Sequence, residues 1–377
     1  YSDIQDGQDS IVTNDNGTVI WGDGNIDLDP VFVDTANGNY HLLASSQLIN
    51  AGDPNSTDSD GTIADIGAYP YLNNYSGPTW YITEGGNDTT ATGASDDPFR
   101  SVQAGINFSS DADSVTVAAG TYVENINFRG RSIKVAGADR ETTIIDGDSS
   151  GSVVTFDSSE DSTALLSGFT IQNGLSENGG GIWCNGTSPT LDNLIIRGNH
   201  SSNYGGGIFC SAGANSTLKN VLLDDNSALS GGGFYLTNSS PELENVSISN
   251  NSSNNAGGGL QCISNSSPSL KNVNIINNSS GTSGGGIRCQ DNSSPSLENV
   301  LIANNTALQK GGGLHCRENS NPSLVNVTIT NNSAGDVCGG IYIRDNSNPI
   351  LMNTVLWNNT LQQIYFISDN NPSTITI

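Results

Sequence analysis

A short apolar–polar–apolar pattern recurs along the second half of the chain, each time directly after a run of glycines. The sequences are GGGIWC, GGGIFC, GGGFYL, GGGLQC, GGGIRC, GGGLHC and CGGIYI, beginning at residues 179, 205, 231, 257, 284, 311 and 338. Alternation with a period of two is typical of a strand with one buried face. Because the steps are 26 or 27 residues, the pattern predicts a repeat with at least one short strand per unit.

Each unit contains two further apolar stretches, as in SPSLKNVNIINN at residues 267–278. Here Leu270, Val273 and Ile275 would point inward from two short strands separated by a bend at Asn272. Three strands per unit would close one coil, and stacked coils would align these positions into a continuous aliphatic core. The pattern therefore predicts an all-β parallel β-helix, or solenoid, with coils of 26–27 residues.

Asparagine recurs at two places in every unit. The first set is 193, 220, 245, 272, 299, 326 and 353, and the second is 199, 226, 251, 278, 305, 332 and 359. Asparagine tolerates left-handed backbone geometry, and its amide can bond to the same amide in the neighbouring coil. The sequence therefore predicts two asparagine ladders running along the solenoid.

An amphipathic helix is predicted over PFRSVQAGINF, residues 98–108. Its apolar side chains would cover the open first coil, so it is expected to cap the N-terminal end. Irregular strands then lead into the regular coils, and we assign residues 81–377 to the β-helix, with residues 73–80 as a linker.

The charge balance narrows the range of partners. The 38 acidic and 12 basic residues give a formal charge of −26, which repels nucleic acid. No apolar stretch is long enough to span a membrane. The sequence therefore predicts neither a nucleic-acid partner nor a membrane span.

The repeat unit SxPSLxNVxIxNNxxxxxGGGIxC resembles repeats of bacterial surface β-helix proteins, including the polymorphic outer-membrane protein type. The wider pattern is similar to the right-handed parallel β-helices of the pectate-lyase-like superfamily. The resemblance covers roughly residues 80–377 and implies a right-handed fold and a secreted, extracellular or cell-surface location. A repeat motif of this kind is specific for the fold and says little about function.

Residues 1–72 do not follow the repeat. They resemble the segment that closes such β-helices at their C-terminal end, although here the segment comes first. We therefore expect residues 1–72 to complete the C-terminal coil of a neighbouring copy, so that the protein partners with itself head to tail. The alternative is that this segment folds back onto its own chain or forms a small independent domain.

Two acidic groups in this segment suit a hard cation. The first is Asp23, Asn25, Asp27 and Asp29, and the second is Asp53, Asp58, Asp60 and Asp65. Oxygen ligands at such short spacing are typical of Ca²⁺ sites, so a structural calcium ion is predicted. The alternative is a set of ordinary Asp/Gly turns, since the spacing matches the EF-hand loop only in part.

The residue between the two inward positions of each post-glycine strand should face outward. Four of these residues are aromatic, namely Trp183, Phe209, Tyr235 and Tyr342. An exposed aromatic stripe could stack on sugar rings or pack against another subunit. The alternative is that these residues merely favour β-structure.

Five cysteines share one inward position of the repeat. They are Cys184, Cys210, Cys262, Cys289 and Cys316, and Leu236 and Ile343 fill the same position in other units. We expect them to act as small core hydrophobes. Disulfides between adjacent coils are permitted by the backbone spacing, although parallel side-chain directions do not favour them.

These observations favour an extracellular structural or adhesive protein that joins head to tail into a filament, fibre or surface stalk. No paired carboxylates or calcium-plus-base grouping stands out, so the chain is predicted not to be an enzyme. The alternative is a β-helix that binds or cleaves polysaccharide.

Overall fold

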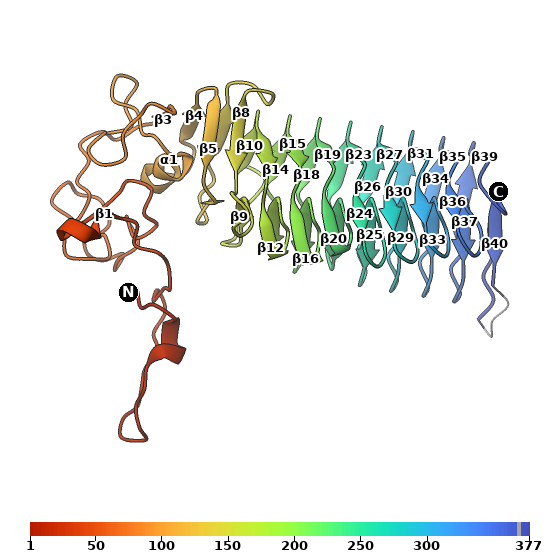
Figure 1. Ribbon diagram of the computed structural model, residues 1–377, viewed down its shortest axis with the longest axis horizontal. Helices are drawn as coiled ribbons and strands as arrows, with labels where there is room; N and C mark the ends of the chain where they lie inside the picture. The colour runs from red at the N-terminus through yellow and green to blue at the C-terminus, as the bar shows by residue number, and fades with distance from the viewer. Residues whose placement is uncertain (368–370) are drawn as a thin grey trace. The chain divides into compact units, whose positions relative to one another are not determined.

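The computed structural model describes residues 1–367 and 371–377, and its chain divides into two compact units (Figure 1). The first unit comprises residues 1–122 and 133–136, and the second comprises residues 123–132 and 137–377. The second unit contains the glycine-rich repeat, and the first contains the predicted capping helix.

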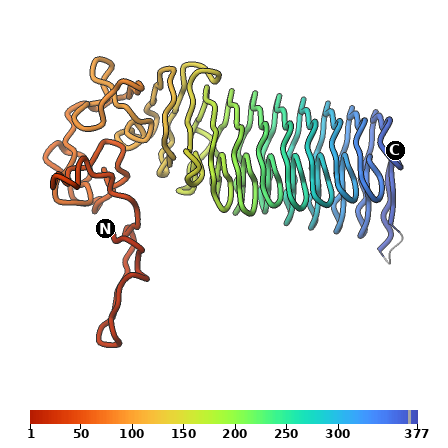
Figure 2. The backbone as a smooth tube through the Cα atoms, in the orientation of Figure 1, coloured from red at the N-terminus to blue at the C-terminus, as the bar shows by residue number. Residues whose placement is uncertain are grey.

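The second unit is a parallel β-solenoid in which each regular coil adds one strand to each of four sheets. Figure 2 shows successive coils following one another along the solenoid. Sheet 1 contains β10 (Leu165–Ser167), β14 (Thr190–Asp192), β18 (Thr217–Lys219), β22 (Glu242–Glu244), β26 (Ser269–Lys271), β30 (Ser296–Glu298), β34 (Ser323–Val325) and β38 (Ile350–Met352). Sheet 2 contains β8 (Thr143–Asp146), β11 (Thr170–Gln172), β15 (Ile195–Arg197), β19 (Leu222–Asp224), β23 (Ser247–Ser249), β27 (Asn274–Ile276), β31 (Leu301–Ala303), β35 (Thr328–Thr330) and β39 (Val355–Trp357).

The other two sheets lie on either side of the glycine turns along the chain. Sheet 3 contains β12 (Leu175–Asn178), β16 (His200–Tyr204), β20 (Ser227–Ser230), β24 (Ser252–Ser253), β28 (Ser279–Ser280), β32 (Thr306–Ala307) and β36 (Ser333–Ala334). Sheet 4 contains β6 (Ile126–Asn127), β9 (Val154–Phe156), β13 (Ile182–Asn185), β17 (Ile208–Ser211), β21 (Phe234–Thr237), β25 (Leu260–Ile263), β29 (Ile287–Cys289), β33 (Leu314–Cys316), β37 (Ile341–Ile343) and β40 (Ile364–Phe366). Our expectation of three strands per coil was therefore wrong. Sheet 3 escaped detection because its strands are short and carry mostly serine, threonine and alanine.

The predicted core positions are buried and in register. Leu270 pairs with Leu243 on one side and Leu297 on the other. Val273 and Ile275 are both fully shielded from solvent. Each apolar column is therefore buried against its neighbours in the adjacent coils, as a solenoid requires.

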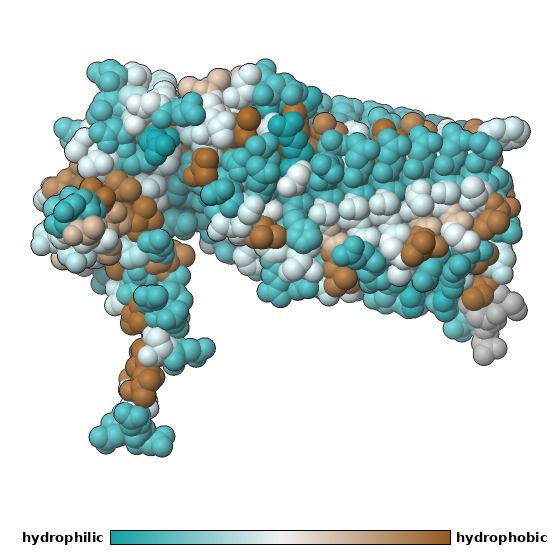
Figure 3. All heavy atoms as spheres, viewed as in Figure 1, coloured by the Kyte–Doolittle hydropathy of each residue, from teal (hydrophilic) through white to brown (hydrophobic). Residues whose placement is uncertain are grey.

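Both predicted asparagine ladders are present, but they differ in kind. Every residue of the first set has a left-handed backbone. From Asn220 onward the exposed amide bonds to the preceding coil, as Asn272 Nδ2 does to Asn245 Oδ1 at 3.2 Å. Residues of the second set are buried. There, Asn278 Nδ2 donates to Ile248 O in the coil before and to Asn305 Oδ1 in the coil after. Figure 3 shows the polar side chains arranged in rows along one face of the solenoid.

The glycine run is required by the close approach of neighbouring coils. A Cβ atom on Gly258 would lie 2.4 Å from Ser279 O and 2.5 Å from Gly285 O, both far inside van der Waals contact. Gly257, directly before it, has a φ of +65°, which favours glycine. The run therefore forms the turn between sheets 3 and 4.

The first unit is mostly irregular. It contains the short 3₁₀ helices η1 (Gly7–Ser10) and η2 (Thr35–Asn37), the antiparallel pair β1 (Phe32–Asp34) and β2 (Asn39–Leu42), and β3 (Thr79–Ile82), α1 (Val102–Phe108) and β4 (Ser114–Val117). The strands β5 (Gly120–Val123) and β7 (Lys134–Gly137) lie where the two units divide. The predicted helix is confirmed as α1, which begins after the cap residue Ser101, and all seven of its residues are buried.

Residues 42–73 pack against this helix within their own chain. The buried Asn107 donates from Nδ2 to Ala44 O at 2.9 Å and to Ser46 O at 2.8 Å. Tyr71 donates its hydroxyl to Ala91 O at 2.6 Å and packs on Phe108 with the ring centres 5.4 Å apart. For this stretch the structure has the fold-back arrangement that the sequence left open.

Candidate functional site

The aromatic stripe predicted to be exposed is in register but buried. Trp183 pairs with Phe209, and Phe209 with Tyr235, in adjacent strands of sheet 4. Only Trp183 is partly exposed, whereas Phe209, Tyr235 and Tyr342 expose 8%, 4% and 1% of their surface. The prediction that all four form an exposed stripe was therefore wrong.

Neighbouring parts of the solenoid cover these rings. Tyr204 of β16 stacks on Tyr235 with centroids 4.6 Å apart and also lies against Phe209. The Lys310 amine lies 5.7 Å from the centre of the Tyr342 ring. Because the rings pack against residues of the same unit, they form a second packed layer outside the aliphatic core rather than a platform for a ligand.

A cluster of basic residues surrounds a buried histidine further along the same column. His315 is 4% exposed, and neither ring nitrogen has a hydrogen-bond partner among the described residues. Its pKa is held well below the usual value by burial and by the charges of Arg288, Arg317, Arg344 and Lys310. These are four of the 12 basic residues in the chain. The imidazole is therefore neutral at neutral pH.

The guanidinium groups of this cluster are largely compensated by carboxylates. Arg344 Nε lies 2.7 Å from Asp345 Oδ2, and Arg317 pairs with Glu318 and with Asp345. Burial, followed by the nearby charge of Arg317, lowers the pKa of Arg288 to about 10. Arg317 and Arg344 therefore form an ion-pair network with Glu318 and Asp345. Arg288 Nη2 instead donates to Gln290 Oε1 at 2.8 Å.

The first acidic group, Asp23, Asn25, Asp27 and Asp29, lies in an irregular stretch of chain in which Asp23 is part of a turn. Asp27 accepts from the backbone N–H of Asp6 at 3.1 Å, Asp29 accepts from that of Val31 at 2.9 Å, and Asn25 Nδ2 donates to Gly22 O at 3.1 Å. The contacts of Asn25 and Asp29 are local, as in the alternative of ordinary turns, whereas Asp27 bonds to a residue 21 positions away.

The second group, Asp53, Asp58, Asp60 and Asp65, also bonds to backbone amides. Asp65 accepts from the N–H groups of Asn50 and Tyr71 at 2.8 and 2.7 Å, while Asp58 accepts from Asp65 N at 2.9 Å. Burial, with a smaller effect from Asp58 and Asp60, raises the pKa of Asp65 to about 6. Within residues 1–367 and 371–377, no three His, Cys, Asp or Glu side chains form a group that could hold a metal ion. The calcium ion stays a prediction.

The cysteine column is confirmed as part of the core. All five members are fully buried and carry free thiols. Cys262 pairs with Cys289, and Cys289 with Cys316, in adjacent strands. Burial raises the pKa of the Cys262 and Cys316 thiols, so these side chains are protonated and packed.

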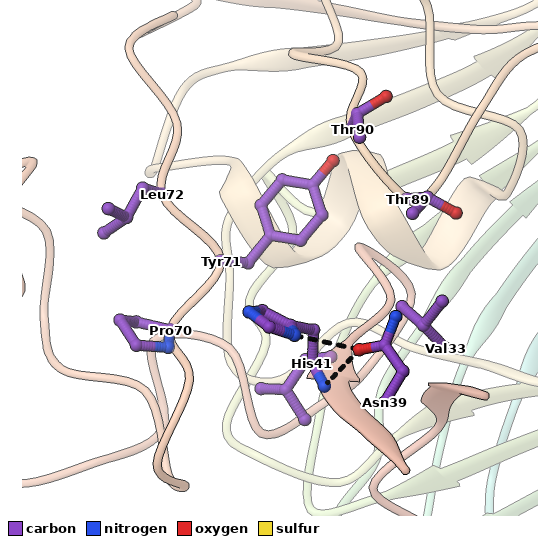
Figure 4. A pocket seen from close by; sticks show the side chains of 9 residues that line it. Val33, Asn39, His41, Pro70, Tyr71, Leu72, Thr89 and Thr90 are labelled. Atoms are coloured by element: carbon purple, nitrogen blue, oxygen red, sulfur yellow. Dashed lines mark hydrogen bonds between the residues drawn. The ribbon is translucent and has the colours of Figure 1, made fainter. Parts of the chain in front are cut away.

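A cavity in the first unit was not predicted. It measures about 380 Å³ and is lined by Val33, Asn39, His41, Leu42, Pro70, Tyr71, Leu72, Thr89 and Thr90. Figure 4 shows Tyr71 between His41 and Thr90. These residues come from three separate parts of the chain and share no sequence motif. The cavity forms only when β1 pairs with β2 and residues 70–72 pack beside them, so no pattern in the sequence indicated it.

The repeat and the fold have counterparts among known proteins. The model of the Chlamydia polymorphic membrane protein repeat matches residues 193–211, a stretch that includes one bend asparagine, one buried asparagine and one glycine run. No curated protein matches the sequence. Pectate lyase Pel9A is 15% identical with a TM-score of 0.49, over 78% of this chain and 80% of that chain. The A-module of the Azotobacter vinelandii mannuronan C-5 epimerase AlgE4 is 13% identical with a TM-score of 0.33, over 70% and 91% of the two chains.

The repeat match confirms the predicted resemblance to polymorphic membrane protein repeats, and the four parallel sheets confirm the predicted β-helix. The comparisons also correct one prediction. We expected a chain that is not an enzyme, whereas both similar solved structures are enzymes, a lyase and an epimerase. At 13–15% identity and with TM-scores of 0.49 and 0.33, these likenesses assign no reaction to this chain.

The match to the polymorphic membrane protein repeat covers 19 of the 377 residues. Among the described residues, none of the helices combines the length and the apolar character needed to cross a bilayer.

Proposed function

We propose that this protein is an extracellular structural or adhesive solenoid whose units join head to tail into a surface stalk or fibre. The resemblance of its coils to a surface-protein repeat supports the surface location. The proposed head-to-tail contact rests on one observation. On the outward face of sheets 1 and 2, the residues of the last coil change from polar to apolar.

Outward positions that are largely polar in the preceding coils become apolar in this coil. Ile350 and Met352 of β38 follow Ser323 and Val325 in register, and Val355 and Trp357 of β39 follow Thr328 and Thr330. Their exposed fractions are 46% for Ile350, 56% for Met352, 51% for Val355 and 72% for Trp357. An exposed apolar patch on an otherwise polar surface is typical of a contact site.

The buried asparagine ladder also changes at this coil. In the inner coils, each asparagine donates to the asparagine of the next coil, whereas Asn359 donates from its backbone N and its Nδ2 to Gln363 Oε1. Gln363 thus takes the place of the next asparagine. We infer that the next contact along the solenoid differs in kind from the contact between two regular coils.

Residues 1–30 are the segment we propose to cover this patch in a neighbouring copy. Val12 and Ile20 of this segment expose 77% and 91% of their surface. In the described part of the chain, its hydrogen bonds run within the segment, as between Ile4 N and Ile26 O. An arm with exposed aliphatic side chains and few outside bonds can rearrange onto another copy at low cost.

Electron microscopy and light scattering of the purified chain test this proposal. We expect end-to-end particles whose length grows with concentration, and we expect Met352→Ser with Trp357→Ser to abolish them. Leu308→Ser is the matched control, because Leu308 is 66% exposed on an inner coil and should leave assembly unchanged. Separate single particles of the unmodified chain at every concentration would contradict the proposal, and a chelator arm tests the predicted role of calcium.

A further inference from the structure

The cavity in the first unit has the size and composition of a small-molecule site. Its volume of about 380 Å³ falls in the usual range for ligand pockets, about 300–1,000 Å³. Its walls combine aliphatic side chains with one aromatic ring and four polar side chains (Figure 4). No Asp, Glu, Lys or Arg side chain lines it.

The hydrogen bonds of Asn39 define the protonation of His41. Asn39 Oδ1 accepts from the backbone N–H of His41 at 3.2 Å, so the atom facing that N–H must be the amide oxygen. The same oxygen lies 2.9 Å from His41 Nδ1, and an amide oxygen can only accept. Nδ1 therefore carries a proton, and in the neutral imidazole Nε2 is the acceptor.

The orientation of the two rings is also restrained. Tyr69 stacks on the imidazole with the centroids 4.6 Å apart. The Tyr71 hydroxyl is bonded to Ala91 O at 2.6 Å, so that residue offers the cavity its ring rather than its hydroxyl. Restrained side chains of this kind lose little entropy when a ligand binds.

The cavity offers donors as well as an acceptor. Thr90 Oγ1 accepts from Asn87 Nδ2 at 3.2 Å, which leaves the Thr90 hydroxyl proton to donate. Asn39 Nδ2 and the Thr89 hydroxyl supply further donors. Two carboxylates, Asp88 and Asp97, raise the pKa of Tyr71 after the larger effect of burial. The local potential is therefore negative and disfavours an anionic ligand.

We propose that this cavity binds a single neutral sugar ring. A pyranose has one face of C–H groups, which suits Tyr71, Leu72 and Val33, and a rim of hydroxyls that both donate and accept. His41 Nε2 accepts from one hydroxyl, while Asn39 Nδ2 and Thr90 donate to others. This site is independent of the head-to-tail contact and gives a surface protein a means of holding a glycan.

Binding is tested by titrating the full chain with N-acetylglucosamine, galactose, mannose and glucose, with galacturonate as the anionic comparison. Saturation-transfer NMR and calorimetry should detect at least one neutral sugar in the millimolar range, the weak affinity expected of one ring, and no binding of galacturonate. Binding of none of the neutral sugars, or equal binding of galacturonate, would overturn the proposal.

Two nearly isosteric variants locate the site. His41→Phe keeps a ring for Tyr69 to stack on but removes the acceptor, and Thr90→Val removes the hydroxyl. Each should weaken sugar binding at least tenfold, while thermal unfolding confirms that the unit is folded. Thr116→Val is the control, because Thr116 is exposed on β4 of the same unit and does not line the cavity. Unchanged affinity in both test variants would assign the bound sugar to another surface and overturn the proposal.

Discussion

The solenoid and the N-terminal unit solve the same problem of satisfying buried polar groups in opposite ways. In the solenoid, one bonding pattern recurs in coil after coil, so that Asn251, Asn278 and Asn305 occupy equivalent positions. In the N-terminal unit, contacts such as those of Asn107 with Ala44 and Ser46 occur once. Because its contacts repeat, the solenoid can be predicted from a period in the sequence. Contacts that occur once produce no such period.

The comparison also extends to charge. Residues 1–72 contain 12 of the 38 acidic residues and none of the 12 basic ones. Many of those aspartates accept from backbone N–H groups in turns, as Asp53 does from Asn55. In the repeated ladders of the solenoid, neutral amides and hydroxyls form the corresponding hydrogen bonds. A stacked ladder of aspartates would place like charges about 4.8 Å apart, so asparagine is the residue that can be repeated.

The largest effect is expected from breaking the buried ladder. Asn278→Leu removes the side chain that joins three coils, so that Asn251 Nδ2, Asn305 Oδ1 and Ile248 O each lose one buried hydrogen bond. We expect a loss of about 3–5 kcal/mol in the free energy of unfolding, measured by urea denaturation. Asn272→Gly is the matched control, since it keeps the left-handed bend and removes one exposed bond, at a cost of about 1 kcal/mol or less. Equal losses in the two variants would refute the distinction between the ladders.

A somewhat smaller effect is expected from the equivalent change in the first unit. Asn107→Ala removes the buried side-chain donor to the carbonyls of Ala44 and Ser46, of which Ser46 O keeps the Ile49 N–H. This loss should cost about 2–4 kcal/mol. Because the contact is not repeated, the loss should be confined to this unit, and hydrogen exchange should show faster exchange at residues 44–50 and unchanged protection in the solenoid. Faster exchange throughout the coils would contradict that confinement.

Acidification should affect the two units in opposite directions. The pKa of Asp65 is raised from 3.8 to about 6 in the folded chain, so the folded state binds this proton more tightly and stability increases as the pH falls through about 6. The pKa of His315 is lowered below 6.5, so the unfolded state binds that proton more tightly and stability decreases as the pH falls below about 6.5.

Denaturation of Asp65→Asn and His315→Phe from pH 4.5 to 7.5 separates the two contributions. Relative to Asp65→Asn, the unmodified chain should gain stability on acidification. Relative to His315→Phe, it should lose stability over the same range. Parallel curves for either pair would show that the residue in question does not contribute to the pH dependence.

The smallest effect is expected in the cysteine column. Leu236 and Ile343 occupy the same position as the cysteines, so Cys289→Val should change the free energy of unfolding by less than about 1.5 kcal/mol. Cys289→Ser places a hydroxyl in the same buried position and should cost more, about 1–3 kcal/mol. A larger loss for valine than for serine would show that the thiols act through bonding rather than packing.

The repeat, the two ladders, the cysteine column and the capping helix could all be predicted from the sequence. Each depends on a local pattern, either a period of two, a recurrence every 26–27 residues or one apolar helical face. The burial of Phe209 and Tyr235 could not be predicted in the same way. The alternating pattern predicts that these side chains point away from the core. It does not predict whether a neighbouring side chain, here that of Tyr204, covers them.

The sequence by itself determined the solenoid, because every coil repeats the same pattern of apolar, asparagine and glycine positions. Each position of the pattern therefore recurs several times along the chain. Only the tertiary structure decided sheet 3, the covered aromatic column and the cavity around His41. The cavity joins residues 33–42, 70–72 and 89–90, which are far apart in the chain and share no period. Contacts of that kind arise from how irregular segments pack, and local sequence patterns carry no record of them.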